Sequence, residues 1–538
     1  MKRLLLLGDE AVAQGGIDAG ISGFYGYPGT PSTEIIEYVQ RSPEAKERNI
    51  HREWSVNEKT AMEAALGMSY AGKRAIVTMK HVGLNVAADA FINSAITGVN
   101  GGLIVVVADD PSMHSSQNEQ DSRFFGKFAF TPILEPTNQQ EAYNMVSYGF
   151  ELSEKYQLPV MLRLTTRIAH SRGGVQTTDK IKKENKIKLP EDPVQFVLLP
   201  SIAKKRYANL LNEQPALVEE ADNSPFNKYF DGEDKSIGII ASGIAFNYLM
   251  ENCPDKCKHP VVKISQYPLP YNLIHRLFNE VDQVLVLEEG YPFIEEQLRG
   301  FFNHSLKPIK GRLDGTVPRT GELNPNIVAK ALGSPINIYH NKSDIIRNRP
   351  PQFCDGCGHI FFYKALNEVM EKYGRGRVFS DIGCYTLAAL SPFNSINSCV
   401  DMGASVTMAK GAADAGLIPS VAVIGDSTFT HSGITGLLDA VRENTNMTLF
   451  ILDNSAVGMT GGQKSAAEGR LEDIIKGLGV DPEHIKIVNP IPKEHQTMVK
   501  VFSEEIAYPG LSVVIPRREC VQTYIRKIKM KKKSKASK

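Results

Sequence analysis

The sequence predicts an α/β protein with three α/β domains whose sheets are mainly parallel. Short, nearly continuous apolar runs, typical of buried strands, alternate with segments of helical spacing. Two of these runs, residues 421–424 and 449–452, end on polar residues and are separated by a single crossover. This βαβ pattern indicates parallel sheets, which bind ligands at the carboxyl ends of their strands.

The composition describes a globular protein of several domains. The chain has 538 residues, of which 42% are hydrophobic and 22% are charged. Its net charge is +1, but residues 524–538 contain eight Lys or Arg and no acid, so the rest of the chain is net negative. We expect this basic tail to be solvated and disordered; docking to an acidic partner or to nucleic acid is the alternative. Nothing else in the sequence indicates a nucleic-acid-binding protein.

The N-terminus resembles a signal peptide only superficially. Its apolar run, residues 4–7, meets acids at once, whereas a signal peptide needs about 7–15 apolar residues. We expect a buried first strand or a strand-to-helix transition there. No run approaches the roughly 20 apolar residues of a membrane span, so we expect a cytoplasmic protein without membrane contact.

Apolar runs and helical patterns divide the chain into five parts. The first contains expected strands at 75–79, 103–108 and 160–164, with helices near 58–70 and 86–96 between them. The second α/β pattern begins with the apolar run 237–241. Residues 336–351 are predicted to form a linker before the third α/β domain. The expected parts are 1–195, a connection at 196–235, a smaller α/β domain at 236–335, a third domain at 352–522, and the tail at 523–538.

The ends of the runs at 421–424 and 449–452 carry oxygen ligands. Asp426 follows Gly425 and precedes Ser427, and Asn454 follows the second run. A carboxylate and an amide beside a glycine turn and a helix start suit a divalent metal that carries a diphosphate. The alternative is that Asp426 merely caps a helix, which aspartate does well.

Longer motifs carry a family resemblance. The 28-residue step from Asp426 to Asn454 resembles the metal–diphosphate signature of thiamine diphosphate enzymes, and residues 460–463, Thr-Gly-Gly-Gln, resemble the 2-oxoacid:ferredoxin oxidoreductase branch. The chain as far as about residue 522 is similar to the large (alpha) subunits of indolepyruvate ferredoxin oxidoreductase. The strings that carry this similarity are residues 27–34, 79–85, 108–120, 288–297, 381–386 and 425–429.

This resemblance implies a thiamine diphosphate-binding fold, with a pyrimidine-binding domain at 1–195 and a diphosphate- and Mg²⁺-binding domain at 352–522. It implies oxidative decarboxylation of arylpyruvates, such as indolepyruvate, to aryl-acetyl-CoA, with CoA as co-substrate and ferredoxin as electron acceptor. It also implies a smaller beta subunit as partner. The rival readings are a non-oxidative thiamine-dependent decarboxylase or lyase, which has no need of the cysteines discussed below, and a non-catalytic subunit of a redox complex.

The family motifs assign roles to individual residues. Glu58 matches the acid that binds the aminopyrimidine, although an exposed acid at a helix start is the alternative and Glu53 and Glu63 lie nearby. The side chains of Asp426 and Asn454 and the carbonyl of Ala456 match Mg²⁺ ligands. Gly425, Ser427 and Thr460 match further cofactor contacts.

A second set of residues matches the substrate side of the family's site. Thr30 lies in a turn that in related enzymes faces the substrate carboxylate, and Lys80, His81 and Asn85 follow a predicted strand end. A turn rich in glycine and proline needs no function to exist, and a lone histidine at such a place is more often structural.

Seven cysteines in a long chain favour metal or redox roles over disulfides. Cys354 and Cys357 form a Cys-x-x-Cys pair, a half-site that zinc also uses. Together with Cys384 and Cys520 they match the ligand set of the family's [4Fe–4S] cluster, which four thiolates suit. We expect Cys399 to be a buried thiol, and Cys253 and Cys257 to be structural without a partner evident from the sequence.

The chain departs from the family pattern near its end. The related alpha subunits usually continue into a ferredoxin-like domain with further cysteine clusters, but no cysteine follows Cys520 here. We therefore expect at most one cluster in this sequence. Either a separate ferredoxin or ferredoxin-like subunit docks here, or the partner subunit takes the electrons directly, or the reaction is not linked to ferredoxin.

Overall fold

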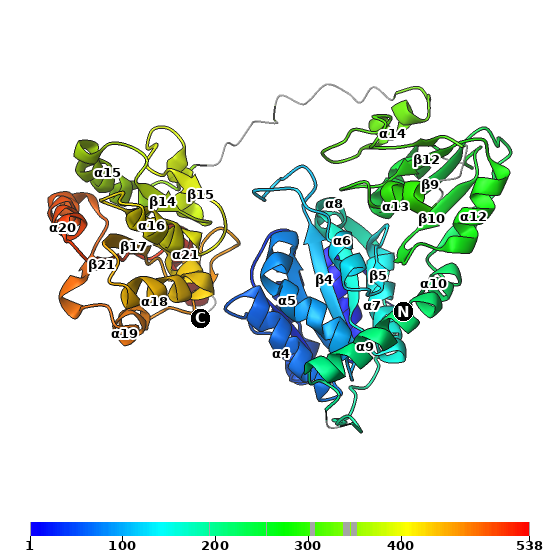
Figure 1. The fold of residues 1–538 in the computed structure, drawn as a ribbon, viewed down its shortest axis with the longest axis horizontal. Helices are drawn as coiled ribbons and strands as arrows, with labels where there is room; N and C mark the ends of the chain where they lie inside the picture. Colours follow the sequence, from blue (N-terminus) through cyan, green and yellow to red (C-terminus); the bar gives the residue numbers. More distant parts are fainter. Residues whose placement is uncertain are drawn as a thin grey trace. The chain divides into compact units, whose positions relative to one another are not determined.

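The computed structural model describes residues 2–192, 194–253, 256–301, 307–336, 345 and 352–536. The chain forms two compact units, Met1–His340 and Asn341–Lys538 (Figure 1). The expected linker at 336–351 lies almost entirely outside the described residues. Three larger sheets, each mostly parallel, carry the fold, so the α/β prediction is confirmed. Among the described residues, no helix combines the length and the apolar character needed to cross a bilayer.

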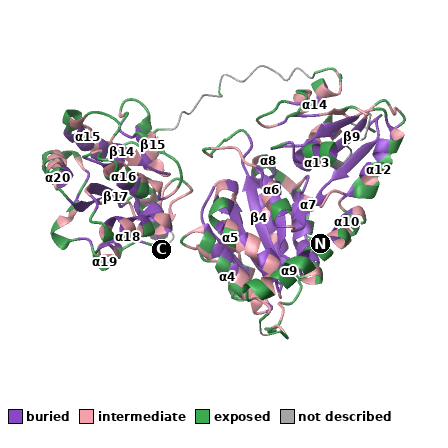
Figure 2. Cartoon of the chain, in the orientation of Figure 1, coloured by how far each residue is buried: buried purple, intermediate pink, exposed green. Residues whose placement is uncertain are grey.

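The first unit is built on a six-stranded sheet with the order β11-β5-β6-β4-β3-β2. All neighbours in it are parallel except β11 and β5. The strands are β2 (Gly23–Gly26), β3 (Ala75–Lys80), β4 (Leu103–Asp109), β5 (Ile133–Leu134), β6 (Val160–Thr165) and β11 (Gln266–Tyr267). They are buried on both faces, as their near-continuous apolar runs predict (Figure 2).

Alternate residues of these strands enter different cores. Val77 and Val105 pack with the helices of one face, whereas their neighbours Ile76 and Ile104 pack on the other. The first face carries α4 (Glu58–Tyr70) and α5 (His81–Thr97), and the second carries α1 (Gly8–Asp18), α2 (Thr33–Arg41) and α7 (Gln139–Tyr156). Shorter helices are α3 (Pro43–Glu47), α6 (Arg123–Phe128) and α8 (Thr166–His170).

The first strand leads directly into a helix, which is one of the two structures expected for this segment. β1 (Arg3–Leu7) pairs antiparallel with β7 (Arg172–Gln176) in a separate two-stranded ribbon. β1 runs directly into α1, so the expected strand-to-helix transition is confirmed, whereas a wholly buried strand is not, because Leu5 is 66% exposed. Leu6 belongs to a buried core and Leu4 packs against it, so alternate leucines of the run are the ones that are covered.

A five-stranded sheet of order β13-β12-β9-β10-β8 follows in the same unit. Its strands are β8 (Lys228–Phe230), β9 (Gly238–Ser242), β10 (Val261–Ile264), β12 (Val284–Leu287) and β13 (Ile309–Lys310). Its helices are α11 (Gly243–Glu251), α12 (Tyr271–Glu280), α13 (Phe293–Phe301) and α14 (Pro325–Ala331); α9 (Pro200–Asn212) and α10 (Gln214–Asp222) precede it. Strand β11, which follows β10, joins the six-stranded sheet and ties the two sheets together.

Buried ion pairs strengthen this junction. Arg163 on β6 and Arg123 on α6 are fully buried. Arg163 Nε lies 2.7 Å from Oδ2 of Asp109, and its Nη2 donates to the Glu289 carbonyl at 3.0 Å. Arg123 Nη1 lies 3.1 Å from Oε2 of Glu288. Charges from both sheets therefore meet in one water-excluded cluster, which explains why the two sheets form one unit.

The second unit has one parallel sheet of order β15-β14-β16-β17-β21-β20. Its strands are β14 (Val378–Ser380), β15 (Ser398–Cys399), β16 (Val421–Gly425), β17 (Met447–Leu452), β20 (Ile485–Val488) and β21 (Leu511–Pro516), and a small hairpin pairs β18 (Ala456–Val457) with β19 (Gln463–Lys464). Its helices are α15 (Gly358–Met370), α16 (Ala404–Asp414), α17 (Asp426–Thr428), α18 (Ile434–Arg442), α19 (Leu471–Gly477), α20 (His495–Ala507) and α21 (Val521–Ala536).

Helix α21 occupies the segment for which the sequence predicts a disordered tail. Lysine and arginine are good helix formers, and Ile525 and Ile528 recur at helical spacing. Arg526 Nη1 donates to the carbonyl of Gly461, and Lys527 pairs with Glu519, which fixes the first turns of the helix.

Candidate active site

Neighbouring strand ends bring the predicted metal ligands together. In β16 and β17, Gly425 is in register with Leu452, so Asp426 and Asn454 follow the adjacent carboxyl ends of two parallel strands. This placement is the one that the apolar runs and their crossover predict. Asn454 Oδ1 accepts a hydrogen bond from the backbone N–H of Ala456 at 3.0 Å, which holds the third predicted ligand beside it.

Asp426 is buried without a counter-charge. Its side chain is 2% exposed, and its Oδ2 has no hydrogen-bond partner in the structure. Burial, and then the neighbouring carboxylate of Asp453, raise the pKa of Asp426 to about 7. The Oγ of Ser427 is likewise buried without a partner. A divalent cation with a diphosphate would satisfy both groups, so these residues fit the cofactor that the sequence predicts.

Asp453, which precedes Asn454 directly after the end of β17, was not among the site residues predicted from the sequence. Arg517 Nε donates to its Oδ2 at 2.6 Å, and the same guanidinium binds Glu472 at 2.8 and 2.7 Å. Asp453 therefore has an ion-pair partner, which it shares with Glu472, whereas Asp426 has none among the described residues. Its position directly before Asn454 was the available signal, but its partner lies 64 residues away.

Thr460 lies in the loop that joins β18 to β19. Its Oγ1 donates to Gln463 Oε1 at 2.9 Å, and Gln463 Nε2 donates back to the Thr460 carbonyl at 2.9 Å. Gly462, at φ 83°, donates its N–H to Val457 at 2.9 Å. The Thr-Gly-Gly-Gln string thus forms a closed turn next to Ala456.

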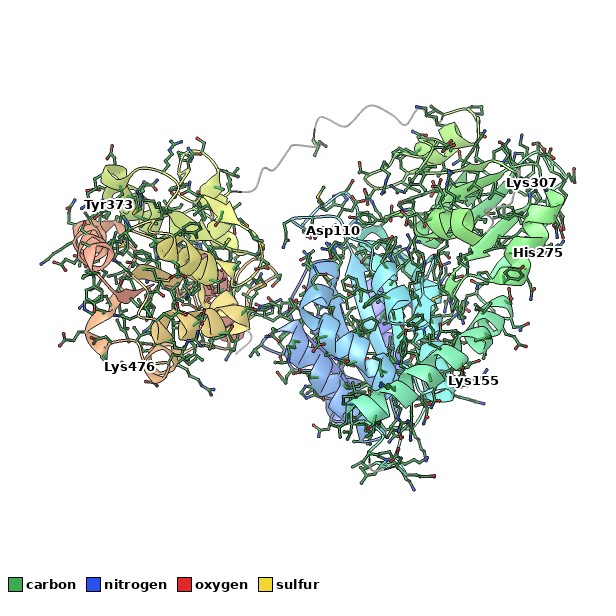
Figure 3. The ribbon with its side chains drawn as sticks, in the orientation of Figure 1. Asp110, Lys155, His275, Lys307, Tyr373 and Lys476 are labelled. Atoms are coloured by element: carbon green, nitrogen blue, oxygen red, sulfur yellow. The ribbon has the colours of Figure 1, made fainter. Side chains whose placement is uncertain are left out.

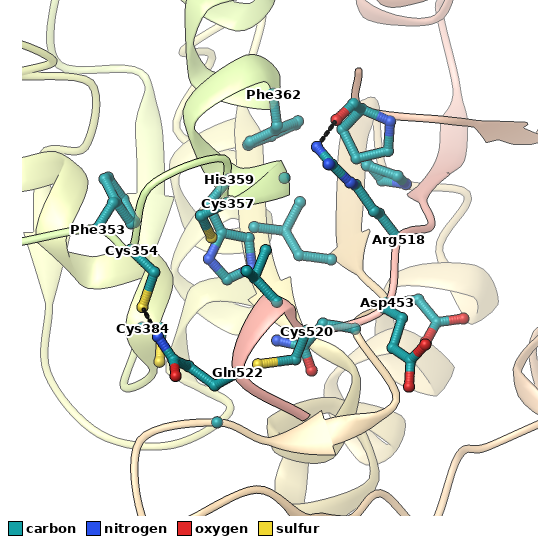
Figure 4. A pocket seen from close by; sticks show the side chains of 18 of the residues that line it. Phe353, Cys354, Cys357, His359, Phe362, Cys384, Asp453, Arg518, Cys520 and Gln522 are labelled. Carbon is teal, nitrogen blue, oxygen red and sulfur yellow. Dashed lines mark hydrogen bonds between the residues drawn. The ribbon is translucent and has the colours of Figure 1, made fainter. Parts of the chain in front are cut away.

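The four cysteines of the predicted cluster line one pocket of the second unit (Figure 4). Cys354 and Cys357 form a turn before α15, Cys384 opens the 3₁₀ turn Cys384–Ala389, and Cys520 precedes α21. Asp453 and Asn454 line the same pocket. Four thiol groups from three separate segments therefore converge beside the edge that carries Asp453 and Asn454.

Two close contacts join the cysteine pocket to that edge. The backbone N–H of Cys520 donates to the carbonyl of Asn454 at 3.1 Å. A Cβ on Gly458 would lie 3.2 Å from Sγ of Cys384 and 3.9 Å from Nδ2 of Asn454. Glycine at position 458 therefore leaves room for Cys384 and Asn454 to approach each other.

Burial opposes the thiolate form of two of the four cysteines in this pocket. Burial raises the pKa of Cys384 to about 12 and also raises that of Cys357, and the other cysteines of the set add to both shifts. Four sulfurs around one zinc ion at 2.3 Å would lie about 3.8 Å apart. Among the described residues, only Asp9, Glu34 and His170 place three ligand atoms within 4.8 Å of one another. Among the described residues, no three of the four cysteine sulfurs therefore lie within 4.8 Å of one another, so they are not preformed at the spacing that a single zinc ion requires.

Of the three remaining cysteines, Cys399 differs from its prediction. Cys399 is exposed, so the expectation of a buried thiol is wrong; it lies at the end of the short edge strand β15, with Sγ 3.7 Å from the carbonyl of Asp381. Cys253 and Cys257 lie with their sulfurs 3.0 Å apart. They are therefore partners of each other, which their spacing alone did not establish.

In the first unit, the predicted substrate residues lie at the carboxyl edge of the six-stranded sheet. The ends of β2, β3 and β4 are adjacent there. Lys80 Nζ donates to the carbonyl of Ser115 at 3.2 Å, and Ser115 Oγ donates to the carbonyl of Thr30 at 3.2 Å. The structure therefore brings Thr30 and Lys80 together through Ser115.

Asp110, which the sequence analysis did not assign, organises this edge. It follows β4 and is labelled in Figure 3. Its Oδ2 accepts from the N–H of Ser115 at 2.8 Å and from Ser116 Oγ at 2.7 Å, and its Oδ1 accepts from Thr166 Oγ1 at 2.7 Å. The paired acids after a buried strand were the signal for it.

His81 and Asn85 take different positions on α5. His81 is buried, and its Nε2 lies 3.1 Å from Oδ1 of Asn118. Asn85 follows one turn later and is exposed. His81 thus packs against the loop that carries Ser115, whereas the structure does not bring Asn85 to Thr30 and Lys80 through any described contact.

Burial distinguishes Glu58 from its neighbours. Glu58 begins α4 and is 5% exposed, whereas Glu53 and Glu63 are exposed. A Cβ on Gly83 of α5 would lie 2.6 Å from Oε1 of Glu58, so only glycine leaves space for this carboxylate. Burial lowers the pKa of Lys80, and the charges of Asp110 and Glu58 oppose this shift, which places Glu58 near the substrate edge.

Known proteins show the same two regions. The family model "Pyruvate flavodoxin/ferredoxin oxidoreductase, thiamine diP-bdg" matches residues 14–218, and "Thiamine pyrophosphate enzyme, C-terminal TPP binding domain" matches residues 381–488. A solved 2-oxoglutarate:ferredoxin oxidoreductase from Magnetococcus marinus covers 62% of this chain and 65% of its own at TM-score 0.49 and 17% identity, a likeness too weak to support an argument.

Relatives match almost the full sequence. Indolepyruvate oxidoreductase subunit IorA from Archaeoglobus fulgidus is 39% identical over 96% of this chain and 86% of its own length. The subunits of the same name from Thermococcus kodakarensis and Methanothermobacter thermautotrophicus are 38% and 37% identical over 96% of this chain, and over 86% and 87% of their own lengths. These matches support a thiamine diphosphate-dependent 2-oxoacid oxidoreductase. The chain belongs to the family of the indolepyruvate oxidoreductase subunits IorA.

Proposed function

We propose that this chain is the thiamine diphosphate-dependent alpha subunit of an arylpyruvate oxidoreductase that forms aryl-acetyl-CoA and reduces ferredoxin. The observation that carries the proposal is the contact between the two predicted centres. A pocket lined by four cysteines reaches the edge of Asp426 and Asn454, and Cys520 and Asn454 are joined by a backbone hydrogen bond. Such proximity suits a reaction whose electrons leave one at a time.

The residues of the second unit would hold the cofactors. Asp426, Asn454 and the Ala456 carbonyl would bind Mg²⁺, while Gly425, Ser427 and Thr460 would border the diphosphate. Cys354, Cys357, Cys384 and Cys520 would hold one [4Fe–4S] cluster. When bound, thiamine diphosphate supplies the electron sink that decarboxylation of a 2-oxoacid requires.

The residues of the first unit would bind and orient. Glu58, buried and fixed against Gly83, would hold a proton at the aminopyrimidine. Lys80 offers an ammonium group for the substrate carboxylate, and the hydrogen bond from this group to the carbonyl of Ser115 orients the lysine side chain. Thr30 lies beside it through the same serine. Asn85, which is exposed, stays a proposed outer contact only.

An acidic electron acceptor suits the start of α21. This helix begins directly after Cys520, and Gln522 Nε2 lies 3.3 Å from Sγ of Cys354. Basic residues crowd the helix, so a ferredoxin or ferredoxin-like subunit bound there would lie close to the proposed cluster. The beta subunit of the complex is the second proposed partner.

The test is anaerobic purification with the beta subunit, followed by iron, sulfide and thiamine analysis and by product analysis with indolepyruvate and CoA. We expect four irons per chain and indoleacetyl-CoA. Cys384→Ser should lose the iron, whereas Cys399→Ser, which alters an exposed cysteine outside the pocket, should keep it. Retained iron in Cys384→Ser would contradict the cluster assignment. An aldehyde product without CoA dependence would favour the non-oxidative decarboxylase instead.

A further inference from the structure

Three side chains outside the proposed active site meet at one end of α1. Asp9 lies in the first turn of α1, Glu34 in the first turn of α2, and His170 is the last residue of α8. One ligand atom from each lies within 4.8 Å of the other two. Glu34 Oε2 is 3.3 Å from His170 Nε2. The three residues are far apart in sequence, so only the fold brings them together.

Close packing of the backbone builds this arrangement. A Cβ on Gly8 would lie 2.2 Å from the carbonyl oxygen of Ile168, so α1 can begin against α8 only because residue 8 is glycine. Gln139 Nε2 donates to the carbonyl of Ser171 at 2.9 Å and fixes the residue after α8. The positions of Asp9 and His170 therefore follow from buried contacts rather than from mobile surface side chains.

Asp9 is the member of the group that lacks a donor. Its side chain is fully buried, and neither Oδ1 nor Oδ2 accepts a hydrogen bond from an N–H or O–H donor of the described residues; the carboxyl group of Glu34 lies beside it instead. Burial, and then the carboxylate of Glu34, raise the pKa of Asp9 well above its usual range. The next acid differs: Glu10 Oε2 accepts from the N–H of Leu7 at 2.9 Å and from Arg172 Nη1 at 3.1 Å. A helix start alone explains a satisfied acid such as Glu10 but not the carboxylate of Asp9.

We propose that Asp9, Glu34 and His170 bind one divalent cation of the class that takes imidazole and carboxylate ligands together, such as Mn²⁺, Fe²⁺ or Zn²⁺. Two carboxylates and one neutral imidazole balance the charge of such an ion. Ligand atoms about 2.1 Å from one ion lie about 3.0 to 3.4 Å apart in octahedral or tetrahedral geometry, and the 3.3 Å between Glu34 and His170 falls in that range.

The surroundings leave space for further ligands. The side chains of Glu34 and His170 are 32% and 33% exposed, so water can complete the coordination from the outer side. Glu34 lies in the first turn of α2, four residues after Thr30, so an ion bound here would fix the helix that follows the turn of Thr30. The proposal is independent of the thiamine and cysteine sites.

Mn²⁺ is the probe, because it binds oxygen and nitrogen ligands and thiolates bind it poorly. All proteins carry Asp426→Asn, which removes the proposed Mg²⁺ site, and free Mn²⁺ is counted by electron paramagnetic resonance. We expect the parent to bind one Mn²⁺ per chain and to release protons on binding. Asp9→Asn and His170→Gln should each weaken binding at least about tenfold, because each removes a ligand. Glu10→Gln is the matched control and should bind as the parent does.

A second readout separates binding from misfolding. Saturating Mn²⁺ should raise the urea midpoint of the parent but not that of Asp9→Asn, because an ion that binds only the folded state stabilises it. If the parent binds no Mn²⁺, or if Asp9→Asn and His170→Gln bind it as tightly as the parent, the proposal is overturned. Asp9 and Glu34 would then share a proton instead.

Discussion

The buried ion cluster of the first unit gives a sharp stability prediction. In Arg163→Leu, the guanidinium disappears from a site where it is fully buried. Asp109 Oδ2 at 2.7 Å loses its ion-pair partner, Glu135 loses one of its two arginines, and the Glu289 carbonyl loses a donor at 3.0 Å. Arg123 still lies 3.6 Å from Glu135, so Asp109 is the carboxylate that is left buried without an ion-pair partner among the described residues. Removing one partner of a buried pair typically costs about 3–5 kcal/mol.

The control is a surface arginine four residues later in the sequence. Arg167 pairs with Glu322 at 2.7 Å, but its side chain is 58% exposed. Exposed ion pairs contribute about 0–1 kcal/mol, so Arg167→Leu should change the stability little. At about 2 °C per kcal/mol for a unit of this size, Arg163→Leu should lower the melting temperature by about 6–10 °C and Arg167→Leu by no more than about 2 °C.

The chain has a single tryptophan, which makes the assay specific. Trp54 packs against a core of the first unit, so its fluorescence during urea unfolding reports that unit alone. Equal urea midpoints for Arg163→Leu and Arg167→Leu would refute the argument that the buried charges hold the two sheets together. Adding Asp109→Asn to Arg163→Leu should recover part of the loss, because one uncompensated charge is then gone.

Three further predictions concern other parts of the chain. Burial raises the pKa of Glu289 to about 7, so the folded state holds a proton that the unfolded state releases. Binding this proton stabilises the folded state. The stabilisation is complete below about pH 4.5 and is lost as the pH rises through 7. Glu289→Gln should therefore flatten the fall in urea midpoint between pH 5 and pH 8, and an unchanged slope would count against it. Gly83→Ala should lower kcat about 100-fold by displacing Glu58, since a misplacement of about 1 Å costs that much. Gly67→Ala is the control, because the added methyl group meets open space, and it should leave kcat unchanged. Equal values of kcat for the two variants would contradict the role of Glu58. Truncation after Thr523 should slow ferredoxin reduction at low salt and have little effect at high salt, because salt screens the attraction between charges. Stopped-flow spectroscopy measures the rate. A defect that does not depend on salt, or no defect, would contradict docking of ferredoxin on α21.

Local patterns in the sequence were enough for the strands and the cofactor edge. The apolar run at 75–79 became β3, and the run at 421–424 became β16 with Asp426 after its end. Strand periodicity and strand-end chemistry depend on neighbours within a few residues, so they can be read directly. The same holds for the Cys-x-x-Cys pair and for the acid at the start of α4.

Contacts between segments that are distant in the sequence could not be predicted from such local patterns. The pairing of Asp453 with Arg517 and the exposure of Cys399 depend on which segments fold against each other. The tail of lysines formed α21 because Arg526 reaches the carbonyl of Gly461 and Lys527 pairs with Glu519. A run of like charges shows composition but not the partner that orders it.

The sequence by itself determined the chemistry of this protein: a parallel α/β fold, the strand ends that carry Asp426 and Asn454, and the four cysteines. Only the tertiary structure decided which charges are buried and which are balanced. Arg517 pairs with Asp453 and Glu472, while Asp426 and Asp9 have no cationic partner among the described residues. The reason is physical, because desolvation and pairing depend on groups brought together from distant parts of the chain, and those terms set the pKa and the cation affinity of each carboxylate.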